Sequence, residues 1–567
     1  MAQPTHLFAR TIAGPDPATT DAATEHVGVL PTQRAGAAEH AGAAEHAGAT
    51  RRWPRLDWAL AIPAALTLVV MLWGLTARSY WGDEADSVSA VSRSLPQLIR
   101  MLGHVDAVHG CYYVLLWLVA QVVGTSEFAT RFPSALAMAA ATLGVCATAR
   151  RLRSRRAALF AGLVFAVIPA VTDQGHDARP YAMVTATAVL AGYLLVRTAE
   201  EPRAYRLTAY GASLAAAGYL QLFALLIIPA HAVTLAWLTR RDRPADGTRP
   251  SPAPRAVVFR RWLATVMVVA AAVAPMAIIS WTQRAQIAWI KTPSGYDMQY
   301  LLNYFGAGSA LSALVVAVLA TLGVTHADPP AATWPGLSRQ GRTRPWQAPR
   351  VLLAGPHLGK QGDSADRGLI WLALPWLVVP PALLLAASEV KPVYSVRYVT
   401  FCLPAVALLA GAGLAALTTP AALAAFVMVA ALALPGQLAL RVPGGVMRSA
   451  ATVLATHGRP GDAIVYPGGG IPPWYLAYPG GFGQLREIGM AVSGPASARL
   501  YGLSAPQSVI KQRELGVSRV WLVEMGPPWP SPADWVAPGF RLVHEYTPDA
   551  GMARLWLYQR DPSPGSP

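Results

Sequence analysis

The chain has 567 residues, of which 54% are hydrophobic and only 13% are charged, and its mean hydropathy is positive, at +0.36. This composition excludes an ordinary soluble protein of several domains and is typical of a chain that crosses the bilayer many times. The formal net charge of +16 does not indicate nucleic-acid binding, because the arginines lie between apolar runs and form no single patch. We expect these arginines to mark cytoplasmic loops and contacts with anionic lipids.

The N-terminal segment, residues 1–50, is polar and rich in alanine and glycine, and a short repeat supplies His40 and His46. This composition predicts a disordered cytoplasmic tail, and a metal-binding histidine tract is the less favoured interpretation. Arg51, Arg52 and Arg55 then precede the first apolar run, whose full membrane length predicts a retained anchor and not a cleaved signal peptide.

Apolar runs of about 17 to 25 residues follow, and about 20 residues suffice for a helix to cross a bilayer. The basic loops 150–156, 240–261 and 325–367 are expected to share the cytoplasmic side with the N-terminus. This topology requires the short run 111–123 to lie as a helix along the outer surface. The sequence then predicts about eleven spans, at 57–77, 128–149, 157–172, 181–198, 207–220, 222–238, 262–282, 307–324, 369–387, 397–418 and 421–440.

Residues 51–440 are therefore predicted to form a mainly α, polytopic transmembrane bundle, and residues 441–567 differ from it in composition. In that C-terminal part, Pro/Gly-rich turns separate short runs that predict strands at 463–466 and 519–523, and a hairpin from 541–546 and 554–558. We expect a small C-terminal α/β domain on the extracytoplasmic side.

The first outer loop, residues 78–127, collects chemically active side chains. Asp83, Glu84 and Asp86 come directly after the first span, and Asp106, His109, Tyr112 and Tyr113 follow. Further polar clusters emerge on the same side of the predicted topology, at 127–131, 173–181, 283–293 and 391–398. Carboxylates beside guanidinium groups suit the transfer of a group from a phosphate leaving group to a hydroxyl. A carboxylate can accept the proton of the attacking hydroxyl, arginines can hold the phosphate, and aromatic faces can contact sugar rings.

Several motifs resemble those of the GT-C superfamily of glycosyltransferases that use polyprenyl-phosphate sugar donors. They are Gly82-Asp83-Glu84, Asp106 to Tyr113, Gly124 to Phe132, Gln174 to Tyr181, and Arg397-Tyr398 followed by Pro404. The similarity covers roughly residues 57–440 and is closest to actinobacterial mannosyltransferase-like members, which are related to protein O-mannosyltransferases and lipid A aminoarabinose transferases.

The resemblance implies an inverting transfer of a hexose, with mannose the favoured sugar, to an acceptor hydroxyl. It implies that Asp83 is the base, that Glu84 orients the acceptor or contacts the donor, and that Arg179 and Arg397 hold phosphate. Gly110 stands where relatives usually have proline, and Gln221 where many have histidine. These departures leave the identity of the acceptor open.

The predicted catalytic residues are thus Asp83 and Glu84. The predicted substrate-binding residues are Asp106, His109, Tyr112, Tyr113, Arg131, His176, Arg179, Tyr181, Trp289, Lys391, Arg397 and Tyr398. No cofactor or metal site is predicted, although a divalent metal stays possible. The expected partners are a polyprenyl-phosphate-linked sugar, membrane lipid, and a glycan, lipid or protein acceptor.

Three alternatives stay open at this point. Arg131 could form a structural ion pair with Glu127, four residues before it. The chain could be a transporter or a flippase for lipid-linked sugars, which would place ionisable residues near helix midpoints. It could also be a sensor whose outer domain binds glycan without catalysis.

Overall fold

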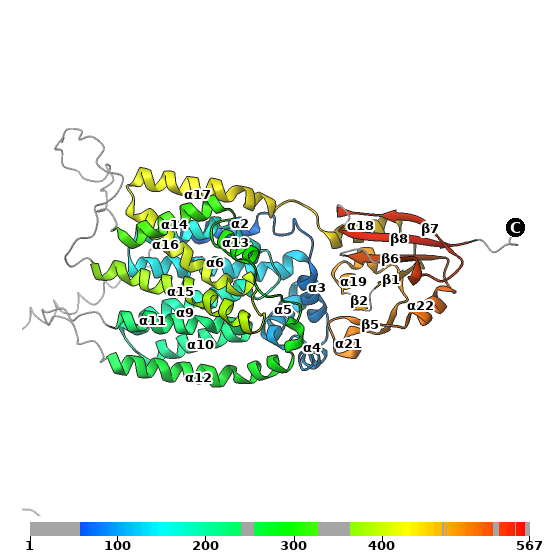
Figure 1. Cartoon of the computed structure of the whole chain (residues 1–567), viewed down its shortest axis with the longest axis horizontal. Helices are drawn as coiled ribbons and strands as arrows, with labels where there is room; N and C mark the ends of the chain where they lie inside the picture. Colours follow the sequence, from blue (N-terminus) through cyan, green and yellow to red (C-terminus); the bar gives the residue numbers. More distant parts are fainter. Residues whose placement is uncertain are drawn as a thin grey trace, which may run out of the picture. The chain divides into compact units, whose positions relative to one another are not determined.

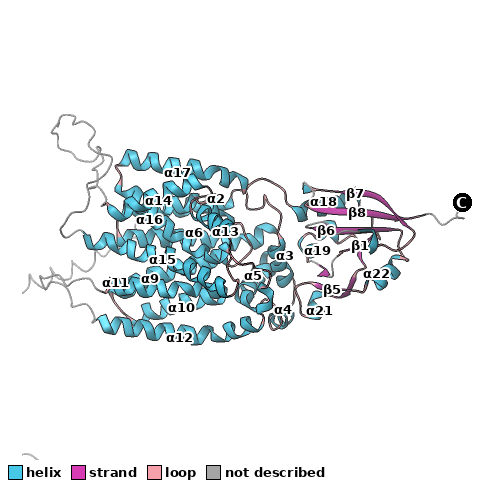
Figure 2. Ribbon diagram, viewed as in Figure 1, coloured by secondary structure: helices cyan, strands magenta, loops and turns pink. Residues whose placement is uncertain are grey.

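The computed structural model describes residues 57–239, 255–326, 363–467, 470–471, 473–525, 532–549 and 552–561. The predictions for residues 1–50, and for most of the loops 240–261 and 325–367, lie outside these residues. From Asp57 onwards the chain forms one compact unit. It contains a large helical part and a smaller C-terminal part with two sheets (Figures 1 and 2).

The helical part runs from Trp58 to Ala439. Its α-helices are α2 (Trp58–Leu72), α3 (Gly82–Val91), α4 (Leu95–Leu102), α5 (Gly110–Val123), α6 (Glu127–Leu152), α7 (Arg155–Val167), α8 (Pro169–Gly175), α9 (Tyr181–Glu200), α10 (Ala204–Leu220), α11 (Ile227–Leu238), α12 (Arg255–Thr282), α13 (Gly295–Phe305), α14 (Ala310–Thr325), α15 (Asp363–Val390), α16 (Leu403–Ala416) and α17 (Thr419–Ala439).

Six helices of the described chain are long and apolar enough to cross a membrane, and two bent pairs raise the number to as many as eight. The chain is therefore a multi-pass membrane protein, with fewer candidate spans than the eleven predicted. The predicted spans 57–77, 207–220 and 222–238 correspond to helices of fewer than 18 residues, α2, α10 and α11. The predicted helix at 111–123 is present as α5.

The first bent pair lies where one continuous span, 157–172, was predicted, whereas in the second pair the predicted span 307–324 covers only α14 and the helix α13 was not predicted. Helices α7 and α8 meet at 66°, and α13 and α14 at 60°. The first bend falls at Pro169, which opens α8 and has no N–H to continue the hydrogen-bond ladder of α7. The second falls at Gly306 to Gly308, where Ala307 and Gly308 adopt positive φ angles of 63° and 102°. Hydropathy alone therefore joined α7 and the start of α8 into one predicted span, because a bend at proline leaves the run apolar.

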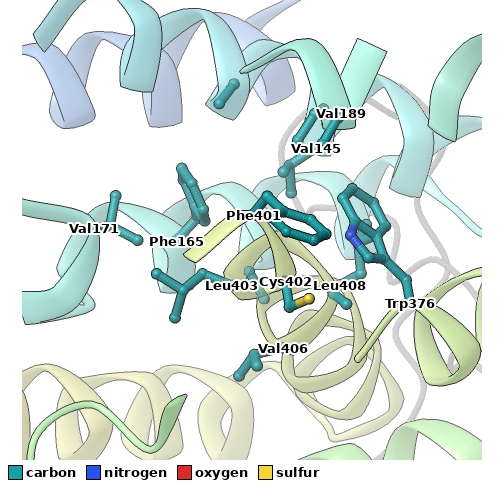
Figure 3. Packing of buried hydrophobic residues seen from close by; sticks show 14 of the residues in the cluster. Val145, Phe165, Val171, Val189, Trp376, Phe401, Cys402, Leu403, Val406 and Leu408 are labelled. Atoms are coloured by element: carbon teal, nitrogen blue, oxygen red, sulfur yellow. The ribbon is translucent and has the colours of Figure 1, made fainter. Parts of the chain in front are cut away.

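Helix α16 and the turn before it form the centre of the helical core. Every residue of α16 is buried. Just before it, Phe401 and Cys402 pack against Trp376 and Phe165 (Figure 3). Helix α16 lies so close against α14 at Gly413 that a Cβ atom there would come within 1.8 Å of the Leu319 carbonyl oxygen. Glycine is therefore required at this crossing.

The C-terminal region, residues 446–561, begins with α18 (Val446–His457) and contains the sheets. The short helices that matter below are α19 (Trp474–Ala477) and α20 (Pro479–Phe482). Other elements are α21 (Gly494–Ser497), α22 (Gln507–Glu514), β1 (Ala463–Val465), β2 (Gly470–Ile471), β3 (Arg486–Glu487), β4 (Met490–Val492), β5 (Gly502–Ser504), β6 (Arg519–Met525), β7 (Phe540–Tyr546) and β8 (Ala553–Arg560).

The main sheet is mixed, with strand order β3-β1-β6-β8-β7. Strand β1 runs parallel to β3 and β6, whereas β8 pairs antiparallel with β6 and β7. A smaller antiparallel sheet has the order β2-β5-β4. The predicted strands at 463–466 and 519–523 and the predicted hairpin are confirmed. Strand β6 could be predicted from its apolar run because both of its faces are buried.

Candidate active site

Asp83 lies in the first turn of α3, where the partial positive charge of a helix N-terminus favours a carboxylate. Its Oδ2 atom accepts a hydrogen bond of 3.0 Å from Arg397 Nη1 and lies 3.9 Å from Arg179 Nη2. The Asp83 side chain is 35% exposed, whereas that of Arg179 is 6% exposed. The predicted base and the two predicted phosphate-binding arginines are therefore neighbours, although they come from three distant segments.

Glu84, the next residue, is buried and fully engaged. Arg131 donates to both of its carboxylate oxygens, at 2.7 and 2.6 Å, and the Ala178 N–H donates to Oε1 at 2.9 Å. The Trp81 N–H also donates to Oε2, at 3.3 Å. Glu84 thus ties the start of α3 to α6 and to the loop before α9, and its contacts are those of a residue that positions Asp83.

The alternative pairing of Arg131 with Glu127 is wrong. Arg131 pairs with Glu84, and Glu127 forms its ion pair with Arg448 of the C-terminal region. The hydroxyl of Tyr478 also donates to Glu127 and accepts the Tyr80 N–H at 2.7 Å. A spacing of four residues suggested a local pair, but burial brought more distant partners to each group.

Asp106, His109 and Tyr113 form a connected polar cluster with Arg179. Asp106 accepts from Tyr113 Oη and from His109 Nδ1, the latter at 2.9 Å, and Arg179 Nη2 donates to His109 Nε2 at 3.0 Å. This arrangement assigns the proton of a neutral His109 to Nδ1. Burial alone would raise the pKa of Asp106, but His109, Arg179 and Tyr113 together outweigh burial and hold that pKa below its usual range.

The turn that presents this cluster is unusual in its backbone. Asp106 adopts a left-handed conformation, with φ of 62°. Its N–H donates to Gln286 Oε1 at 3.2 Å, and the next N–H, of Ala107, donates to Gln283 Oε1 at 2.9 Å. The predicted outer segment 283–293 therefore contributes by fixing this turn. Asparagine and aspartate tolerate this conformation better than most residues.

Trp81 organises the other side of Arg397. The Arg397 guanidinium lies over the Trp81 ring, 4.6 Å from its centroid, and Trp81 Nε1 donates to Asp177 Oδ1 at 3.0 Å. Burial and the nearby Glu84 charge raise the pKa of Asp177. Tyr398 stacks on Phe223, with ring centroids 5.2 Å apart. Gln221, the second departure from the family pattern, donates to the Tyr398 carbonyl at 3.4 Å.

The remaining predicted residues make structural contacts or lie apart from Asp83. Tyr112 and Tyr181 are buried, and the Tyr112 hydroxyl has no hydrogen-bond partner among the described residues. His176 Nε2 bonds the Met71 carbonyl oxygen at 2.7 Å, which makes a structural contact. Trp289 is exposed, and Lys391 Nζ lies over the Trp281 ring, 5.7 Å from its centroid. The structure does not join these last two residues to the Asp83 cluster.

Two cavities adjoin the start of α3. The small cavity, of about 290 Å3, is lined by Arg397, Arg131, Asp173 and Asp177 among others. The large cavity, of about 800 Å3, is lined by residues of the first outer loop and of the C-terminal region. Arg78, Ser79 and Trp81 line both cavities. Within the described ranges, no three His, Cys, Asp or Glu side chains come together as candidate metal ligands.

Sequence reasoning missed the contribution of the C-terminal region. Tyr501 Oη donates to Asp86 Oδ2 at 3.3 Å, and Tyr478 reaches the backbone of Tyr80. The sequence signal was the aromatic, Gly/Pro-rich stretch 466–482, which predicts turns that pack over the membrane domain and that are candidates for framing the acceptor groove, but none of its residues was chosen for the site. Asp177, the partner of Trp81, was part of a predicted cluster but was not chosen as a site residue.

Residues 111–246 match the family model described as dolichyl-phosphate-mannose-protein mannosyltransferase. No curated protein sequence matches the chain.

Two solved structures share the fold at low sequence identity. The structure of ArnT from Cupriavidus metallidurans bound to undecaprenyl phosphate is 14% identical, with a TM-score of 0.52, over 91% of this chain and 100% of that one. ArnT from the same organism in the apo state is 13% identical, also with a TM-score of 0.52, over 88% and 97% of the two chains.

The chain therefore shares the fold of ArnT along most of its length, whereas the family match covers one segment of it. Segment 111–246 is similar in sequence to the dolichyl-phosphate-mannose-protein mannosyltransferases. The matched segment includes Arg131, His176 and Arg179, whereas Asp83 and Arg397 lie outside it.

Proposed function

We propose that the protein transfers a hexose, mannose in the first instance, from a polyprenyl-phosphate carrier to an acceptor hydroxyl on the extracytoplasmic side, with inversion and with Asp83 as the base. The observation that carries this proposal is the half-exposed Asp83 carboxylate between two guanidinium groups, 3.0 Å from Arg397 and 3.9 Å from Arg179. An acid for proton uptake and cations for phosphate thus occupy one place. The similarity of segment 111–246 to dolichyl-phosphate-mannose-protein mannosyltransferases, and of the fold to ArnT bound to undecaprenyl phosphate, supports a lipid-phosphate donor.

The reaction needs one proton transfer and one displacement. The acceptor oxygen attacks C1 of the donor sugar and forms the new glycosidic bond, while the bond between C1 and the phosphate oxygen breaks. The hydroxyl proton passes to the Asp83 carboxylate. The polyprenyl phosphate departs with one more negative charge than the phosphodiester carried, so nearby cations stabilise the transition state more than the ground state.

The two arginines are suited to different parts of this task. Arg179 is held by His109, Tyr113 and the Asp83 carbonyl, so its charge is fixed in place before substrate arrives. Arg397 has an ion pair only with Asp83 among the described residues, and its face rests on Trp81. Phosphate of the donor would compete with Asp83 for Arg397. Donor binding would thus turn Arg397 towards phosphate and free the Asp83 carboxylate to accept a proton.

Glu84 and Asp106 act through other residues in this proposal. Glu84 holds the first turn of α3 through Arg131, and Asp106 holds His109 and Tyr113 against Arg179. Both carboxylates lose little solvent on substrate binding because they are already buried or paired. They are positioning residues. Among these three acids, Asp83 alone has a partly exposed carboxylate beside two arginines.

The experiment uses membranes that contain the full chain, with radiolabelled polyprenyl-phosphomannose as donor and polyprenyl-phosphoglucose as the competing sugar. Wild type is compared with Asp83→Asn, and Asp561→Asn is the control because Asp561 is an exposed carboxylate of the C-terminal region. Loss of a general base lowers the rate on the order of 10²–10⁴-fold. Label transfer by Asp83→Asn at the wild-type rate would exclude Asp83 as the base. Faster transfer from the glucose donor than from the mannose donor would make glucose the donor sugar.

A further inference from the structure

The large cavity is built from two parts of the chain that are far apart in sequence. Trp81 and Asp86 come from the first outer loop, whereas Trp474, Tyr501 and Asp549 come from the C-terminal region. The methionines Met447, Met525 and Met552 complete much of the apolar wall. A volume of about 800 Å3 lies within the range of roughly 300–1,000 Å3 that is usual for ligand sites.

Asp86 gives this cavity an unused hydrogen-bonding group. Its Oδ2 accepts from Tyr501 Oη at 3.3 Å, whereas its Oδ1 is buried and has no partner among the described residues. Buried polar atoms normally have a partner, so an orphaned oxygen in a cavity wall indicates a place for a ligand group. Burial also raises the pKa of Asp86 to about 7, so near neutral pH its carboxyl can donate as well as accept a hydrogen bond.

The position of Asp86 relative to Asp83 links the cavity to the chemistry. The two residues are three apart in α3, and residues with this spacing are neighbours on one helix face. Gly82, directly before Asp83, also lines the large cavity. A molecule that bonds Asp86 can therefore present a second hydroxyl towards Asp83.

We propose that the large cavity is the acceptor subsite and that the acceptor is a glycan, whose sugar ring packs against the aromatic side chains Trp81, Trp474 and Tyr501 while one of its hydroxyls bonds Asp86. This inference rests on the proposed function, because it names the acceptor class for the same reaction. The C-terminal region then helps to choose the acceptor, and the helical part supplies the base and the phosphate-binding groups.

The wall chemistry favours a glycan over the other two acceptor classes. Aromatic faces with a few hydrogen-bonding groups match the alternating apolar and hydroxyl surfaces of a sugar ring. Two carboxyls, of Asp86 and Asp549, line the cavity with a single guanidinium, of Arg78, and this excess of acids disfavours an anionic lipid headgroup. A peptide acceptor remains an outcome of the test, as does a neutral glycerolipid.

The test measures binding to the full-length protein in nanodiscs by saturation-transfer NMR, without donor. The probes are trisaccharides of mannose, glucose and galactose, a Ser/Thr-containing octapeptide, and dihexanoylglycerol. The variants are Asp86→Leu, which removes the polar group at similar size, Asp86→Asn, which retains hydrogen bonding, and Tyr501→Phe. The matched controls are Asp561→Leu and Tyr205→Phe, both at exposed positions outside the cavity.

We expect at least one trisaccharide to bind wild type, with Kd raised about fivefold or more by Asp86→Leu and by Tyr501→Phe, and restored in part by Asp86→Asn. The controls should bind as wild type does, and an unchanged Tm shows that each variant is folded. The inference is overturned if no trisaccharide binds wild type, or if Asp86→Leu and Tyr501→Phe bind the trisaccharide as tightly as wild type does. It is also overturned if these two variants lose binding of the peptide or the glycerolipid instead. Transfer by Asp83→Asn would instead overturn the proposed function and leave the glycan site standing.

Discussion

The buried pair of Glu84 and Arg131 offers a quantitative test of how the site is held together. Arg131→Met removes both bonds to the Glu84 carboxylate and also three bonds from the guanidinium to the carbonyls of Leu75, Arg78 and Ser79. Glu84 then keeps only two backbone donors for a buried charge. Breaking a buried pair in this way costs about 3–5 kcal/mol. Because Glu84 lines the small cavity, where water can reach it, we expect a loss near 3 kcal/mol.

The assay is equilibrium unfolding in mixed micelles for a double-mutant cycle of Glu84→Gln, Arg131→Met and the double variant. The double variant leaves no unpaired buried charge, so its loss should be smaller than the sum of the two single losses. We expect a coupling energy of about 1–3 kcal/mol. Hydrogen exchange at residues 79–84 should rise in Arg131→Met and fall back in the double variant. Additive losses, within about 0.5 kcal/mol, would refute the view that this pair fixes the start of α3.

Three further outcomes follow from the same contacts. Arg397→Ala should raise KM for the polyprenyl-phosphate donor at least tenfold, and Arg397→Lys less, whereas an unchanged donor KM would exclude Arg397 from phosphate binding. The pKa of Asp86 rises from 3.8 to about 7 on folding. Between pH 3.8 and about pH 7 the folded chain keeps a proton on Asp86 that the unfolded chain has lost, so this carboxyl makes the protein less stable as pH rises. Asp86→Asn should therefore raise Tm more at about pH 8 than at about pH 5, and an equal change at both would contradict this. Tyr478→Phe removes the acceptor of the Tyr80 N–H and the donor to Glu127, so exchange of that amide should rise, and an unchanged rate would show that Tyr478 does not hold this loop.

The sequence was most informative where a pattern reports on a local or chemical requirement. A continuous apolar run predicted β6, which is buried on both faces, and β8 of the predicted hairpin is likewise mostly buried. The positive-inside rule grouped Asp83, Arg179 and Arg397 on one side before any contact was known. Their 3.0 and 3.9 Å separations agree with that grouping.

The sequence was least informative where partners were chosen by burial. The spacing of Arg131 to Glu127 suggested a helical pair, but Arg131 bonds Glu84, 47 residues away. The bend at Pro169 divided an apolar run that hydropathy had joined. Tyr501 gave no sign of lining a cavity with Asp86, because its place depends on how the C-terminal region packs against α3.

The central claim is that Asp83 accepts the acceptor proton during sugar transfer, and a single-turnover measurement tests it most directly. Purified wild type and Asp83→Asn are each loaded with saturating polyprenyl-phosphomannose, donor occupancy is verified, and the rate of mannosyl transfer after acceptor addition is followed. The account predicts equal donor occupancy and a transfer rate lowered on the order of 10²–10⁴-fold in Asp83→Asn. Transfer at the wild-type rate by fully loaded Asp83→Asn would contradict it.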